Sequence, residues 1–118
     1  MELKVSEIII DDDEELSSLY FKHKTGYFAI ARTIDDDYIY LELDEQIYGE
    51  NFTPSIFKYN INNGNISFTI DLENKKTINY LKEKKMCYHL YTEIELIYPP
   101  VDIEKFNRIN EVLEDIFL

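Results

Sequence analysis

Apolar and polar residues alternate on both sides of Asn63-Gly64, and this alternation is the clearest structural signal in the chain. Asn-Gly favours a two-residue turn, because a type I′ hairpin needs positive φ angles at both central residues. With that turn, the apolar pairs are Phe57/Ile70, Tyr59/Phe68 and Ile61/Ile66. All of them share one face, and a shift by one residue would break the agreement. The sequence therefore predicts an antiparallel hairpin over residues 57–70 with one buried face.

Alternating stretches elsewhere predict four further strands. They are Glu2–Ile10, Tyr27–Thr33, Tyr38–Asp44 and His89–Tyr98. The second and third are expected to form a hairpin, because the aspartates between them are typical turn residues. The acidic run Asp11–Glu15 is expected to be a solvated loop or the first turn of a short helix. Residues 45–54 are expected to be a loop ended by Pro54.

Two helices are predicted, a clear one at the C-terminus and a short one over residues 74–85. Asp102 is a good N-cap, and Val101 and Phe106 occupy the positions of a hydrophobic staple. The apolar positions that recur at helical spacing are Ile103, Phe106, Ile109, Leu113 and Ile116. The short helix is indicated by Ile78 and Leu81, three residues apart among lysines.

These elements predict an α+β fold in a single domain, residues 1–118. The sheet is expected to have about six strands, mostly antiparallel, with both helices packed on it. No apolar run approaches the roughly 20 residues that a membrane-spanning helix needs, and the N-terminus does not read as a signal peptide. Cys87 is the single cysteine, so we expect no internal disulfide and a cytoplasmic location.

The charge is strongly acidic, with 24 Asp and Glu against 12 Lys and Arg, a net charge of −12. Residues 1–50 carry 14 acidic and 4 basic side chains, so most of the excess lies in the first half of the chain. Such a field repels nucleic acids and membrane surfaces and accelerates encounter with basic proteins. Solubility alone is an equally good explanation of an acidic composition.

The sequence offers little for catalysis, metal binding or a cofactor, and none of the three is expected. Cys87 and His89 are two residues apart at a predicted strand start, but a buried Cys beside a surface His explains this spacing better. The run from Asp11 lacks the Gly and Glu that a calcium loop requires at positions six and twelve. There is no Gly-rich phosphate loop and no zinc-binding spacing.

A protein-binding surface is the remaining candidate. Tyrosine is favoured at the energetic centre of interfaces, and carboxylates steer a basic partner. The candidate contact residues are Asp35, Asp36, Asp37, Tyr38, Tyr40, Glu42, Asp44 and Tyr48. The alternative is that these tyrosines lie beneath a loop or helix and only complete the packing.

The order of elements resembles immunity protein family 10 of bacterial polymorphic toxin systems. The residues that carry the resemblance are Tyr27–Arg32, the acidic turn, Tyr38–Gln46 with Tyr48-Gly49, Asn65–Asp71, Glu93–Leu96 and the helix from Ile103 to Phe117. In residues 45–54, where members often carry a Gly-rich segment, this chain has Gly49 alone. The resemblance implies a small domain that binds and neutralises a toxin.

The expected function is therefore a cytoplasmic immunity protein that binds a cognate secreted toxin domain, a basic one such as a nuclease. A nucleic-acid mimic from a phage or mobile element is the alternative, and a small enzyme comes third. Neither nucleic acid nor membrane is expected as a partner. The identity of the toxin and the oligomeric state do not follow from the sequence.

Overall fold

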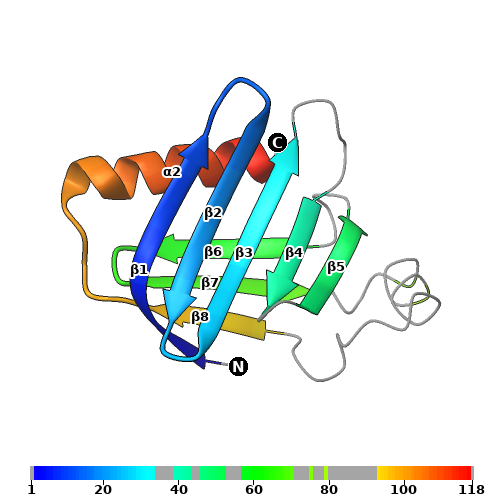
Figure 1. Ribbon diagram of the computed structural model, residues 1–118, viewed down its shortest axis with the longest axis horizontal. Coiled ribbons are helices and arrows are strands. Elements are labelled where there is room, and N and C mark those ends of the chain that lie inside the picture. The colour runs from blue at the N-terminus through cyan, green and yellow to red at the C-terminus, as the bar shows by residue number, and fades with distance from the viewer. Residues whose placement is uncertain are drawn as a thin grey trace.

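Eight strands and the helix α2 contain most of the described residues (Figure 1). The structure is a computed structural model, and it describes residues 2–33, 39–43, 46–52, 57–70, 75, 79 and 93–117. The elements are β1 (Glu2–Asp12), β2 (Leu16–His23), β3 (Gly26–Thr33), β4 (Ile39–Leu43), β5 (Gln46–Phe52), β6 (Phe57–Asn62), β7 (Asn65–Ile70), β8 (Glu93–Ile97) and α2 (Ile103–Phe117). Among these residues, no helix is long and apolar enough to cross a membrane.

The strands form one mixed sheet in the order β5-β4-β3-β2-β1-β8-β7-β6. All pairings are antiparallel except that of β1 with β8. Figure 1 shows β6–β8 crossing behind β1–β5 at a steep angle. The sheet is thus folded over itself at β1, which gives two layers with a shared interior.

A bulge in β1 marks the place where the sheet folds over. The first residues, Glu2–Lys4, pair with β8, and the pairing with β2 shifts register between Val5 and Glu7. The extra residue is Ser6, whose hydroxyl donates to the Lys22 carbonyl oxygen at 3.3 Å. Because a bulge adds one residue to an alternating strand, it reverses which residues face inward. This explains why the alternation of the sequence breaks down before the three isoleucines.

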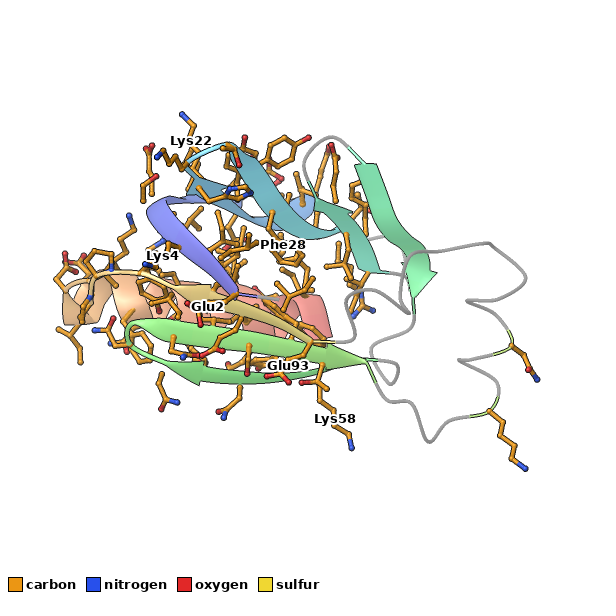
Figure 2. All side chains as sticks on the ribbon, turned by 90° about the horizontal axis from the view of Figure 1, so that it is seen from below. Glu2, Lys4, Lys22, Phe28, Lys58 and Glu93 are labelled. Carbon is orange, nitrogen blue, oxygen red and sulfur yellow. The ribbon has the colours of Figure 1, made fainter. Side chains whose placement is uncertain are left out.

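The core lies between the two layers. Figure 2 shows Phe28 between them, with Lys22 pointing outward from one layer and Lys58 from the other. Phe28 is fully buried, and its ring lies 6.2 Å from Phe21 and 5.6 Å from Phe68, centroid to centroid. This row of rings therefore joins β2 and β3 to β7 across the interior.

Helix α2 closes the interior by packing against β1 and β2. The predicted cap is confirmed, because the Lys105 amide donates to Asp102 Oδ1 at 2.8 Å. The buried side chains of the helix are Ile109, Val112, Leu113 and Ile116. At the other end, Arg32 Nη1 donates to the Ile116 carbonyl at 2.9 Å. A cation from β3 thus satisfies a free carbonyl at the negative end of the helix dipole.

The predicted apolar face of this helix was partly wrong. Ile103 is 74% exposed, and Phe106 is only partly buried and is not among the side chains packed on the core. Val112 takes a core position instead. Figure 1 shows the start of α2 reaching beyond β1, the last strand of its layer. Helical spacing alone does not show where the sheet ends.

The hairpin β6–β7 has the predicted register, with Tyr59 opposite Phe68 and Asn62 opposite Asn65. Its turn also holds the segment that leads into α2. The Asn63 side chain donates to the Val101 carbonyl at 2.7 Å and accepts from the Val101 amide at 3.0 Å. These two bonds mimic a strand pairing, so the turn positions the start of the helix.

Gly64→Val is expected to lower the free energy of unfolding by about 1–3 kcal/mol. Gly64 has a φ of +103°, which a β-branched residue rarely adopts, and a Cβ there would lie 3.4 Å from the Tyr98 carbonyl oxygen. Urea denaturation measures the loss. The control is Thr69→Val, an exposed strand position that tolerates a β-branched residue. Equal midpoints for the two variants would show that no positive φ is needed at Gly64.

Several predicted elements need correction. The described part of the sheet has eight strands rather than about six, because residues 16–23 and 46–52 are also strands. The second of these was predicted to be a loop, but it pairs with β4 through two register irregularities that hide its alternation. The first strand runs on to Asp12, into the predicted acidic loop. The short helix of residues 74–85 lies outside the described residues, except for Lys75 and Asn79, which are helical.

Candidate functional site

Tyrosine side chains gather on the outer face of β2, β3 and β4. Alternation along these strands puts Leu19, Phe21, Phe28, Ile30 and Leu41 into the core. Their neighbours must then point outward. We call the resulting group the tyrosine face; it consists of Tyr20, Tyr27, Ala29, Ala31, Tyr40 and Glu42, all partly exposed. None of the described elements packs over this face, since α2 lies on the opposite side of the sheet (Figure 1).

Glu42 holds two of the tyrosines in place. The Tyr27 hydroxyl donates to Glu42 Oε1, and the Tyr40 hydroxyl donates to Glu42 Oε2 at 2.8 Å. The Tyr20 and Tyr27 rings are stacked, with centroids 4.7 Å apart and planes inclined by 20°. Since stacking and hydrogen bonds restrict these rings before any partner arrives, binding would cost them little side-chain entropy.

Two alanines lie among these larger side chains. Ala29 is opposite Tyr20 on one side and Glu42 on the other, and Ala31 is opposite Tyr40. Their methyl groups are much shorter than the flanking rings. The tyrosine face is therefore an apolar strip along β3, bordered by phenol rings and a carboxylate. This mixture of aromatic area and polar edge is typical of the centre of protein interfaces.

The structure brings together two of the predicted contact residues, Tyr40 and Glu42. Asp35–Asp37, Tyr38 and Asp44 lie outside the described residues, and Tyr48 is described only by its backbone in β5. Sequence reasoning missed Tyr20, because the strand β2 was not predicted, and left Tyr27 out of the set. The alternation of Leu19 and Phe21 with Tyr20 was the signal that would have found it.

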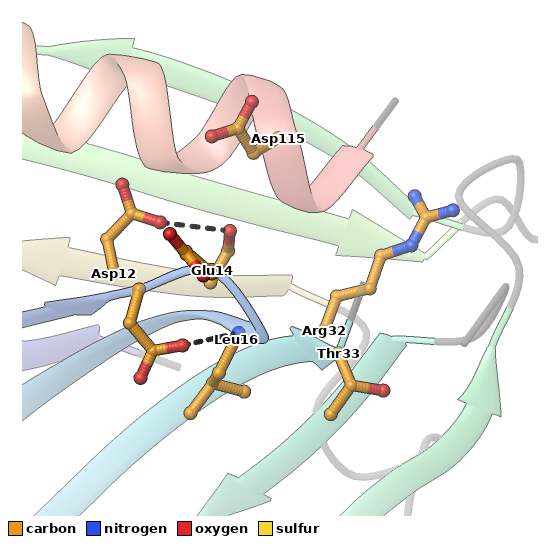
Figure 3. A pocket seen from close by; sticks show the side chains of 8 residues that line it. Asp12, Glu14, Leu16, Arg32, Thr33 and Asp115 are labelled. Carbon is orange, nitrogen blue, oxygen red and sulfur yellow. Dashed lines mark hydrogen bonds between the residues drawn. The ribbon is translucent and has the colours of Figure 1, made fainter. Parts of the chain in front are cut away.

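An acidic pocket of about 350 Å³ lies where the β1–β2 turn meets the end of α2 (Figure 3). Asp13 Oδ1 accepts from the backbone amides of Glu15 and Leu16 at 2.7 and 2.9 Å, and Asp12 Oδ1 accepts from the Ser17 hydroxyl at 3.3 Å. These carboxylates shape the turn. Within the described ranges, no group of three or more His, Cys, Asp or Glu is arranged to hold a metal ion.

The two residues considered for catalysis, Cys87 and His89, lie outside the described residues. The prediction that the pair is structural therefore stays a prediction.

Comparisons of the chain with protein-family models, with curated proteins and with solved structures give no match. The resemblance to immunity protein family 10 therefore rests on the residues quoted for it.

Proposed function

We propose that this protein is an immunity protein that acts in the cytoplasm, binds a basic toxin domain through the tyrosine face and so masks the toxin. The observation that carries the proposal is the pair of phenols fixed by Glu42 on a sheet face that no described element covers. Ordered tyrosines supply a large contact area at a low entropy cost. The net charge of −12 supports a basic partner, because opposite charge accelerates encounter.

The mechanism needs no chemical step. A toxin domain is neutralised when its substrate-binding surface is covered, and a basic nuclease must carry cationic groups on that surface to hold phosphates. An acidic protein with aromatic anchors can occupy such a surface. The carboxylates would steer approach, and the tyrosines would then slow dissociation. Charge and aromatic contacts therefore act on different rate constants.

Changing Asp35, Asp36 and Asp37 together to Asn is expected to slow association with the toxin domain and to flatten its salt dependence. Charges at the edge of an interface act mainly on the association rate. Salt screens them, because the Debye length falls to about 3 Å at 1 M salt. Surface plasmon resonance against the domain encoded beside this gene measures both rates. The matched control changes Glu104, Glu111 and Glu114 to Gln, which removes the same charge from exposed positions of α2.

Equal slowing in both triple variants would mean that only the net charge matters. Slowing in the control alone would place the interface on α2. Unchanged association of the aspartate variant at low salt would remove the Asp35–Asp37 turn from the proposed interface.

A further inference from the structure

About half of strand β1 has an edge with which no described strand pairs, and we call it the free edge. The first residues of β1, Glu2–Lys4, pair with β8, and among the described strands the rest of β1 pairs with β2 alone, on the other side. Among the described residues, no backbone hydrogen bond reaches the remaining edge between Ser6 and Asp12. Figure 1 shows β1 at the end of the row formed by β5 to β1. Unpaired amides and carbonyls along a strand edge are a template for another strand.

A groove runs beside this edge, toward the start of α2. It has a volume of about 380 Å³ and is lined by Ile8, Ile10, Asp102, Glu104, Lys105 and Arg108. The apolar part comes from β1, and the charged part comes from the helix. A strand added to β1 would turn every second side chain into this groove. Small apolar side chains there would contact Ile8 and Ile10.

The outer side of the same edge is acidic. Glu7 and Asp11 are exposed, and between them the large apolar side chain of Ile9 is 43% exposed. Ile9 lies opposite Tyr20, so this surface continues the tyrosine face. Side chains of an added strand would lie directly beside these three residues. Cross-strand pairs of opposite charge are favourable, and pairs of like charge are not.

We propose that the free edge of β1 binds an extended basic segment of a protein partner as an additional strand. The segment would carry Lys or Arg at two positions four residues apart, beside Glu7 and Asp11, with small apolar residues at the positions between them that face the groove. Backbone hydrogen bonds supply affinity in this mode, and the alternating side chains supply selectivity. The tyrosine face is not needed for this binding, so the inference does not depend on the proposed function.

Charge argues against a second copy of this chain as the occupant. If two β1 strands paired antiparallel so that their Ile9 residues met, Glu7 of each would face Asp11 of the other. In-register parallel pairing would set each carboxylate beside its own copy. Like charges directly opposite are destabilising in either arrangement. A basic segment removes that repulsion and covers Ile9.

The test uses the whole protein and the capped peptide Ser-Lys-Val-Thr-Val-Lys-Ser. Nuclear magnetic resonance titration is expected to show saturable shifts of the backbone amides of residues 6–12. Two further peptides carry N-methyl groups. The first is methylated on the amides along one edge of the extended peptide, and the second on the amides along its opposite edge. Only one edge can bond to β1, so one methylated peptide should lose at least tenfold in affinity and the other should bind nearly as the parent. A peptide with Glu in place of both Lys should not bind.

Variants of the protein test the charge pairing. The double variant Glu7→Lys with Asp11→Lys is expected to bind the parent peptide at least tenfold more weakly than the unchanged protein does. The double variant Glu111→Lys with Glu114→Lys makes an equal charge change on α2, and its affinity for the peptide should stay within about twofold of the unchanged protein. Absence of binding up to millimolar peptide would overturn the proposal. So would equal binding of both methylated peptides, or a concentration-dependent dimer in which the same amides shift. None of these measurements uses the toxin domain.

Discussion

Phe28→Ala is expected to lower the free energy of unfolding by about 3–5 kcal/mol, the range found when a buried Phe is removed from a core. Phe28 is completely buried and contacts a ring from each layer, Phe21 and Phe68. Its loss opens a cavity at the place where the folded sheet is held together. Phe21 and Phe68 are themselves fully buried, so neighbouring atoms have little freedom to fill the space.

Phe106→Ala is the matched control, since it removes the same group from a partly exposed position on α2. We expect a cost of about 1 kcal/mol or less, because substitutions away from the core have small effects. Urea denaturation followed by circular dichroism measures both. If the two variants lose equal stability, the layers are not held together by the Phe21–Phe28–Phe68 row, and α2 has a different apolar face.

Tyr27→Ala and Tyr40→Ala are each expected to weaken toxin binding by about 2 kcal/mol or more, chiefly through faster dissociation. Both rings stand on the tyrosine face, and each donates its hydroxyl to Glu42. Truncating either ring removes contact area and also frees one oxygen of the carboxylate. The dissociation rate constant should therefore rise by roughly 30-fold.

Two sets of controls separate the ring from its hydrogen bond and from the rest of the surface. Tyr27→Phe and Tyr40→Phe keep the ring and remove only the hydroxyl. The change in their dissociation rates therefore measures how much the hydrogen bonds to Glu42 contribute to binding by holding the rings in place. Lys58→Ala and Thr69→Ala alter exposed positions on the other layer and should bind like the parent protein. Parent-like dissociation in both alanine variants of the tyrosines would remove this face from the interface.

The hairpin β6–β7 and the cap of α2 could be predicted because their signals are local. Asn63-Gly64 fixes the turn and the alternation fixes the register, while Asp102 needs only the amide of Lys105, three residues away. The last predicted strand, His89–Tyr98, contains β8 (Glu93–Ile97), whose alternation puts Ile94 and Leu96 in the core. Each of these features depends on a short stretch of chain.

The features that were missed depend on distant residues. The bulge at Ser6 lies within the pairing of β1 with β2, directly after the residues of β1 that also pair with β8, and nothing in the local sequence indicates it. Arg32 caps α2 from a strand 84 residues earlier. The tyrosine face likewise combines three strands, so Tyr20 could join Tyr40 and Glu42 only once their pairing through β3 was known. The sequence therefore predicted a binding surface of tyrosines and carboxylates, but it identified only some of the residues that form it.

The most direct test of the proposed function places an arginine in the middle of the tyrosine face. Ala29→Arg puts a long cation between Tyr20 and Glu42, at an outward strand position that is partly exposed. Ser67→Arg is the matched control, since Ser67 is an outward position of the other layer and also lies opposite a glutamate, Glu95. Both proteins should fold.

The measurement is survival of cells that express the adjacent toxin domain together with each variant, with binding of the purified proteins measured in parallel. We expect Ala29→Arg to abolish protection and to weaken binding at least a hundredfold, and Ser67→Arg to protect like the parent. Full protection by Ala29→Arg, with thermal midpoints of both variants close to the parent value, would contradict the claim that the tyrosine face binds the toxin.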